Sequence, residues 1–72
     1  MKAILEFNLP EEQSEYQTAN QAGALHSILW DLDNELRNNL KHGHKFKTAD
    51  DALEYVRAFL HAELGDHNVQ LY

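Results

Sequence analysis

The chain has 72 residues, no cysteine, and a net charge of −6 from twelve acidic and six basic side chains. Its length leaves room for one domain, residues 1–72, and the missing cysteines exclude disulfides and thiol chemistry. The net negative charge disfavours direct binding to nucleic-acid backbones, which are also negatively charged. No apolar run reaches the roughly 20 residues of a membrane span. We therefore expect a small cytoplasmic protein that contacts no membrane.

Residues 1–8 alternate between apolar side chains on one side and mostly polar side chains on the other. A period of two is typical of a half-buried strand. The apolar side is formed by Met1, Ala3, Leu5, Phe7 and Leu9. Residues 69–72 form a second short apolar segment, and we expect the two terminal segments to pair as a two-stranded sheet.

A first helix is expected to begin at Leu9-Pro10-Glu11-Glu12. Proline suits the first helical position, and the acidic side chains after it favour the positive end of a helix. We expect this helix to reach about Gln21 and to be followed by a break or kink near Gly23. Because a lone glycine costs only about 1 kcal/mol in a helix, a single helix over residues 10–42 is the alternative.

The next segment has the clearest helical pattern, because its apolar residues recur every three or four positions. They are Leu25, Ile28, Leu29, Leu32, Leu36 and Leu40. Lys41 and His42 favour the negative end of the helix, and Gly43 is a natural cap beyond it.

A third helix is expected after Thr48, because threonine three residues before Asp51 resembles a capping box. Its apolar face is formed by Ala49, Ala52, Leu53, Val56, Phe59, Leu60 and Leu64, and Gly65 is expected to end it. The predicted fold is thus α+β and mostly α, in the order β-α-α-α-β. Two or three amphipathic helices would cover one face of the short terminal sheet.

Such a small fold is expected to self-associate. A two-stranded sheet is marginal in water, and a core of this size rarely supplies more than about 3–5 kcal/mol. No disulfide adds to that stability. We therefore expect a homo-oligomer, a dimer or higher.

Trp30 is the first candidate binding residue, since it lies roughly 130° around the helix from the centre of the leucine stripe. His26, Asp33 and Arg37 share its side of the helix. Tryptophan and arginine are enriched at the energetic centres of protein interfaces. Trp30 therefore either packs under the first helix or anchors a partner, with these three neighbours around it.

Four of the six basic residues fall within eleven positions and form a second candidate site, for an anion. They are Arg37, Lys41, Lys45 and Lys47. They either capture a phosphate or an acidic partner, or they pair with nearby carboxylates and offset the helix dipole.

No catalytic, metal or cofactor site is predicted. His42 and His44 flank a glycine, but two ligands in a loop make a weak metal site. The serines lack a nucleophile elbow, and the three glycines form no phosphate-binding loop. We expect a protein that is not an enzyme.

The segments MKAILEFNLPEE (residues 1–12), LWDLD (29–33) and Leu36-Arg37 resemble small proteins encoded by bacteriophages. The resemblance implies the cytoplasm of a bacterial host and an accessory role in infection, and it carries no catalytic residue. The leading hypothesis is that the chain binds a host or defence protein without catalysing a reaction. In one form of this hypothesis, binding inhibits that protein. One alternative is a homo-oligomer that sequesters a small anionic ligand such as a nucleotide. A lesser alternative is an acidic mimic of DNA.

Overall fold

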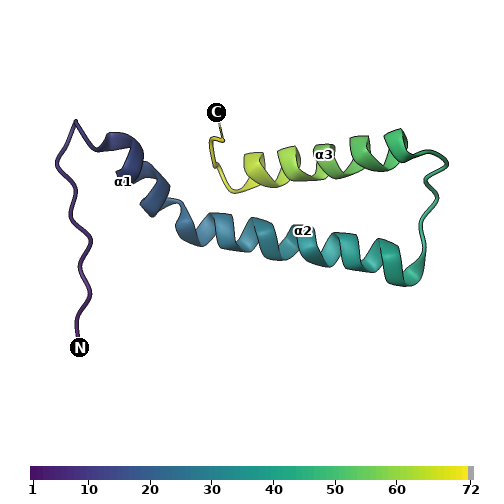
Figure 1. Cartoon of the computed structure of the whole chain (residues 1–72), viewed down its shortest axis with the longest axis horizontal. Coiled ribbons are helices and arrows are strands. Elements are labelled where there is room, and N and C mark those ends of the chain that lie inside the picture. Colours follow the sequence, from purple (N-terminus) through teal and green to yellow (C-terminus); the bar gives the residue numbers. More distant parts are fainter. Residues whose placement is uncertain (72) are drawn as a thin grey trace.

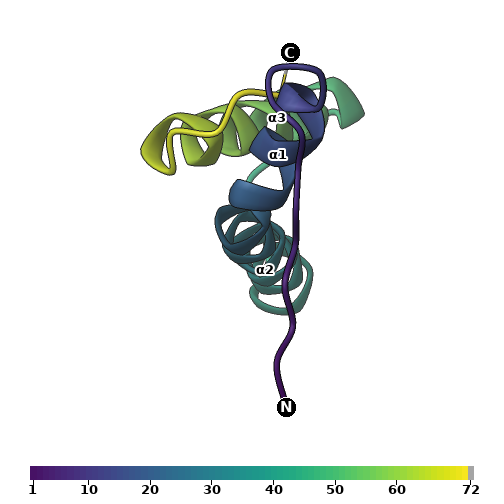
Figure 2. The same ribbon diagram turned by 90° about the vertical axis from the view of Figure 1, so that its left-hand side faces the viewer.

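The computed structural model describes residues 1–71 as an extended arm followed by three helices (Figure 1). The helices are α1 (Gln13–Asn20), α2 (Ala22–His42) and α3 (Ala49–Asp66). α2 and α3 lie antiparallel and form a helical hairpin, which is closed by the loop of residues 43–48. α1 continues at an angle from the start of α2. The arm, residues 1–8, runs away from α1 as a single extended segment (Figure 2).

The predicted two-stranded sheet is wrong, because no strand occurs within residues 1–71. The order β-α-α-α-β therefore has to be corrected to an arm and three helices. The arm has the extended conformation that its alternation predicted, but it has no partner strand there. Figure 1 shows the arm and the C-terminal segment well apart. Of the predicted closing strand, Tyr72 lies outside the described residues.

The C-terminal segment turns back onto α3, which explains why it forms no strand. Asn68 adopts a left-handed conformation with φ of 55°. Its N–H donates to the carbonyl oxygen of Gly65 at 3.1 Å, and the N–H of Val69 donates to that of Leu64 at 2.9 Å. These two hydrogen bonds form a Schellman motif, in which an apolar contact commonly accompanies the turn. Val69 makes that contact, so its side chain is already committed to the core.

Three predicted helix boundaries also need correction. The predicted pair of helices within residues 10–42 is confirmed and the single-helix alternative is wrong, but the break lies at Gln21 and Gly23 lies inside α2. Pro10 belongs to a turn before α1, which begins only at Gln13. Gly65 does not end α3, because Asn68 supplies the left-handed residue and the helix continues to Asp66.

The other two helix ends are formed as predicted. Gly43 caps α2 with φ of 91°, a conformation that favours glycine, and its N–H donates to the carbonyl oxygen of Asn39. The side-chain oxygen of Thr48 accepts a hydrogen bond from the N–H of Asp51 at 3.1 Å, so Thr48 is the N-cap of α3.

A small apolar core lies where α2 begins and α3 ends. Ile28, Leu64 and Val69 are its buried members, and Ile28 is only 2% exposed. Partly buried apolar side chains surround it, namely Ala24, Leu25 and Leu60. The core therefore joins the two helices at one end of the hairpin and leaves the loop end more open.

The molecule is much more extended than a compact protein of its size. Its accessible surface is 6397 Å², about 1,800 Å² more than the roughly 4,600 Å² expected of a folded monomer of 8.3 kDa. Its radius of gyration is 16.6 Å, against about 11 Å for a compact domain of 72 residues. None of the helices within residues 1–71 is both long and apolar enough to cross a membrane. A single helical hairpin with an arm leaves much apolar surface uncovered.

Two neighbouring residues test where the core lies. Ile28→Ala should lower the free energy of unfolding by about 2–5 kcal/mol, because it opens a cavity among buried side chains. Leu29→Ala is the matched control, since Leu29 is 66% exposed, and should change it by less than about 0.5 kcal/mol. Urea unfolding followed by circular dichroism measures both. Equal effects of the two substitutions would contradict the assigned core.

Candidate functional site

An uncovered stripe of leucines runs along α2. At about 100° per residue, these leucines lie about 80–120° around the helix from the buried Ile28, beyond the side that α3 covers. We call Leu29, Leu36 and Leu40 the outer stripe. Leu40 is 84% exposed, and the other two are also exposed. The leucine pattern of α2 is therefore wider than the surface of α3 packed against it, and half of it faces solvent.

The outer stripe leads into an apolar groove at the loop end of the hairpin. Leu36 and Leu40 belong to both the stripe and the groove. The other lining residues are Asn39, His44, Phe46, Ala52 and Val56. The Phe46 ring forms one wall and lies 5.0 Å from the His44 ring and 5.1 Å from the Tyr55 ring, between centroids. Stripe and groove together form one continuous apolar surface.

Trp30 lies beside the outer stripe and is 63% exposed, so it does not pack under α1. The three residues predicted to accompany it, His26, Asp33 and Arg37, are exposed on the same side of α2. By helical position they fall between the outer stripe and Trp30 or next to it. The structure thus brings the predicted partner-binding residues together on one open surface, next to the apolar stripe.

The structure brings the four predicted anion-binding residues together only in part. Arg37 and Lys41 share a shallow surface on α2 with Asp33, Leu36 and Leu40. Lys45 and Lys47 lie on the loop after the helix. All four side chains are exposed, and none makes an ion pair within residues 1–71. They form an open basic region at the loop end.

Charge is segregated along the molecule. Residues 3–36 contain seven acidic side chains and no lysine or arginine, whereas residues 37–47 contain four basic side chains and no acidic one. The acidic set is Glu6, Glu11, Glu12, Glu15, Asp31, Asp33 and Glu35. Figure 1 places α1 and the hairpin loop at opposite ends of α2, so the molecule has an acidic end and a basic end.

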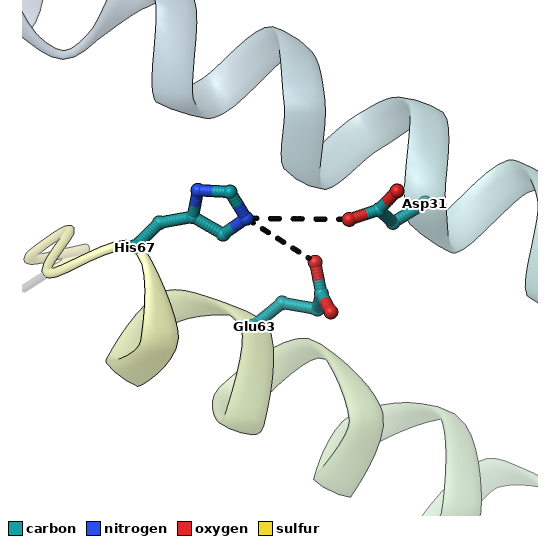
Figure 3. A group of neighbouring side chains, drawn as sticks. All are labelled: Asp31, Glu63 and His67. Carbon is teal, nitrogen blue, oxygen red and sulfur yellow. Dashed lines mark ion pairs between the residues drawn. The ribbon is translucent and has the colours of Figure 1, made fainter.

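A cluster of two carboxyl groups and an imidazole joins α2 to α3 (Figure 3). The Nε2 atom of His67 lies 3.6 Å from a carboxyl oxygen of Glu63 and 4.0 Å from one of Asp31. The Oε2 atom of Glu63 is buried and has no hydrogen-bond partner among the described residues. The hydrogen bond between the carboxyl groups of Glu63 and Asp31, helped by desolvation and by the repulsion of the Asp31 charge, raises the pKa of Glu63. A protonated Glu63 carboxyl group that donates to Asp31 would place a shared proton between α2 and α3.

The same three side chains offer the kinds of ligand atom that zinc binds. One atom from each lies within 4.8 Å of the other two, and no other such group of three occurs within residues 1–71. Tetrahedral ligands bonded at about 2.0 Å lie only roughly 3.3 Å apart, so the side chains would have to move closer to share an ion.

A second polar contact crosses the middle of the hairpin. The Tyr55 hydroxyl donates to the Oε1 atom of Glu35 at 2.6 Å, and the side chain of Asn39 donates to the same atom at 3.2 Å. The hydrogen bond to Glu35 raises the pKa of Tyr55 above its ordinary value of 10.0. The contact fixes Tyr55, which in turn supports the Phe46 wall of the groove.

Sequence reasoning missed both the acid–imidazole cluster and the groove. Glu63 and His67 are four positions apart in a helix, a spacing that brings side chains together and could have identified half of the cluster. Asp31 comes from another helix, and no local pattern pairs it with them. The Phe46 wall was missed for the same reason, because it depends on how the loop returns toward α3.

The raised pKa of Glu63 predicts how stability depends on pH. A carboxyl group with a raised folded-state pKa stabilises the fold below its ordinary value near 4.5, and this contribution is lost as pH rises through the raised value. Glu63→Gln keeps a hydrogen-bond donor toward Asp31 at every pH. We therefore expect the variant to melt at a higher temperature than the wild type at pH 7, with the difference vanishing near pH 4. Glu54→Gln, on the same helix but exposed, is the control and should show no such change. A lower melting temperature for Glu63→Gln at pH 7 would refute the shared proton.

Comparison of the chain with protein-family models, with curated proteins and with solved structures finds no match. The resemblance to small bacteriophage proteins therefore stays an expectation, and the surfaces described above carry the functional argument.

Proposed function

We propose that this chain is a non-catalytic binding protein that docks the outer stripe and Trp30 of α2 onto another protein. In the bacterial setting that the resemblance implies, the partner is a host or defence protein. The observation that carries the proposal is the exposed apolar surface of α2, which α3 leaves uncovered. Soluble proteins rarely expose large continuous apolar patches unless these bind something.

The molecule as a whole has surface to spare for a protein partner. Its excess accessible surface of about 1,800 Å², which includes the arm, exceeds the roughly 800 Å² that each partner buries in a stable interface. Trp30 and Arg37 are residue types that contribute most to such interfaces, and both lie at the edge of the stripe. The apolar centre and the polar edge of a typical interface are thus both present.

The charges indicate what the partner surface is like. Asp33, Arg37 and Lys41 share a surface with Leu36 and Leu40, so the border of the outer stripe carries charges of both signs. A partner with an apolar patch bordered by both acidic and basic side chains would complement this surface. Opposite charges at the border speed association and make it depend on salt.

Sequestration of a small anion has less support. Four exposed basic side chains spread over one helix and a loop do not enclose a ligand, and small-molecule sites are normally concave. Only Arg37 and Lys41 lie together on one surface.

The binding surface is tested with single substitutions. The tagged protein is used to capture its partner from bacterial lysate, the partner is identified and purified, and the dissociation constant is measured. Trp30→Ala and Leu40→Ser should each raise the dissociation constant by tenfold or more, because each removes an exposed apolar contact. Both variants should keep the circular dichroism of the wild type, since neither side chain belongs to the core.

Leu9→Ser is the matched control, because Leu9 is also exposed but lies outside the hairpin. It should leave the dissociation constant unchanged. Binding that is equally strong for all three variants would refute the docking surface, as would a lysate that returns only the protein itself.

A further inference from the structure

The arm is an unpaired strand with both of its edges open. Residues 1–7 make no backbone hydrogen bond within the described chain, and apart from Phe7 every residue of the arm is exposed. Ile4 and Leu5 are among the most exposed large apolar side chains of the molecule. Free N–H and C=O groups along an extended, apolar edge favour pairing with another chain.

We propose that the arm pairs with the arm of a second copy as an antiparallel two-stranded ribbon centred on Ile4. Opposite residues in this ribbon have numbers that sum to eight, so that Ile4 faces Ile4 of the second copy. This pairing joins two copies of the arm. It differs from the sheet that was predicted and found to be wrong, in which the arm paired with residues 69–72. Closed two-fold symmetry follows, because each arm gives and receives the same contacts.

The charges of the arm select this direction and register. In the proposed register Lys2 of each copy faces Glu6 of the other, which makes two equal ion pairs on either side of Ile4. A parallel pairing would place like charges side by side, a destabilising arrangement. Antiparallel registers shifted by two residues would place Lys2 opposite Ile4 or Asn8 and lose both ion pairs. Among these pairings, only the proposed one places each charged side chain of the arm, Lys2 and Glu6, opposite a side chain of the other sign.

The apolar side of the arm is also satisfied in this register. Met1 faces Phe7 of the second copy, and Ala3 faces Leu5, so every apolar side chain on this side meets another apolar side chain. The same side already lies toward α1, where the Phe7 and Tyr16 rings meet edge to face at 5.8 Å between centroids. Leu5 and Phe7 line a hollow with Tyr16, Ala19 and Asn20 of α1, so Met1 of the second copy would lie beside it.

The ribbon needs only part of the surplus surface. A standard interface takes roughly 800 Å² from each copy, which is less than half of the excess of about 1,800 Å². The outer stripe on α2 stays free, so a dimer would present two copies of the proposed docking surface. The inference does not depend on the proposed function, because the arm and the outer stripe are different surfaces.

Charge reversal tests the register. The dimer dissociation constant is measured by sedimentation equilibrium of the full chain. Lys2→Glu alone puts two pairs of glutamates face to face, and Glu6→Lys alone puts two pairs of lysines face to face. Each should weaken the dimer by on the order of tenfold, since two cross-strand pairs change from attraction to repulsion.

The two single variants should restore each other when they are mixed in equal amounts. In the mixed dimer a glutamate at position 2 faces a lysine at position 6, and the native pair remains at the other end. The double variant Lys2→Glu/Glu6→Lys should likewise dimerise as the wild type does. Lys45→Glu and Glu11→Lys are controls that make the same charge changes outside the arm and should leave the dimer intact.

A disulfide cross-link tests the central position independently. The natural chain has no cysteine, so Ile4→Cys creates a single thiol. Directly opposite residues of antiparallel strands have Cα atoms about 4.5–5.5 Å apart, within the range of a disulfide. Leu5→Cys is the control. In the proposed register position 5 of one copy faces position 3 of the other, so the two cysteines at position 5 are about two residues apart along the ribbon. At equal low concentration, oxidation should link the Ile4→Cys copies much faster.

Three results would overturn the proposal. A wild type that stays monomeric at millimolar concentration would exclude the ribbon. Single charge variants that mixing fails to restore would exclude the register, and so would equal oxidation rates of the two cysteine variants. The leucine and tryptophan variants of α2 should not change the dimer, so failure of the ribbon and failure of the docking surface are distinguishable.

Discussion

The arrangement of the molecule depends on the small contact among Ile28, Leu64 and Val69. This contact exists because the chain after α3 turns back through a left-handed asparagine and places Val69 against both helices. It joins α2 to α3 at one end only. The rest of the hairpin is held by polar contacts, by partly buried apolar side chains such as Leu32, Val56 and Phe59, and by the loop, while the outer stripe stays open to solvent.

Polar groups take the place of a longer apolar core between the two helices. The carboxyl groups of Asp31 and Glu63 meet beside His67, and Tyr55 donates to Glu35 further along. Both contacts raise a pKa, of Glu63 and of Tyr55, because in each case a neighbouring carboxyl group favours the protonated form. The stabilisation from Glu63 is therefore lost as pH rises through the raised pKa of its carboxyl group, and that from Tyr55 is lost at alkaline pH when its hydroxyl ionises.

The open surfaces are arranged in a definite way. The outer stripe and Trp30 lie on α2. The arm lies at the end of the molecule that is opposite to the hairpin loop, and acidic and basic residues occupy separate parts of the chain. A small chain with this much uncovered apolar surface is expected to associate with other chains, since burial of apolar surface is the main favourable term in folding and association. Two separate surfaces, one on the arm and one on α2, allow self-association and partner binding at the same time.

Several local elements could be predicted from the sequence, because each signal lies within a few residues. Leucine spacing predicted α2, and threonine and glycine predicted the start of α3 and the end of α2. The alternation of residues 1–8 predicted a half-buried strand, and that prediction is wrong, because the arm is exposed and unpaired. Helical spacing also predicted that Trp30, His26, Asp33 and Arg37 share one side of α2, where they are exposed, and their role in partner binding stays a proposal.

What each helix face contacts depends on how the helices pack. The sequence could not show that α3 covers one half of the leucine stripe, or that Val69 enters the core in place of a strand. Nor could it pair Asp31 with Glu63 and His67. These contacts join residues that are distant along the chain, and their geometry depends on how the helices pack against each other. Local periodicity carries no information about that packing.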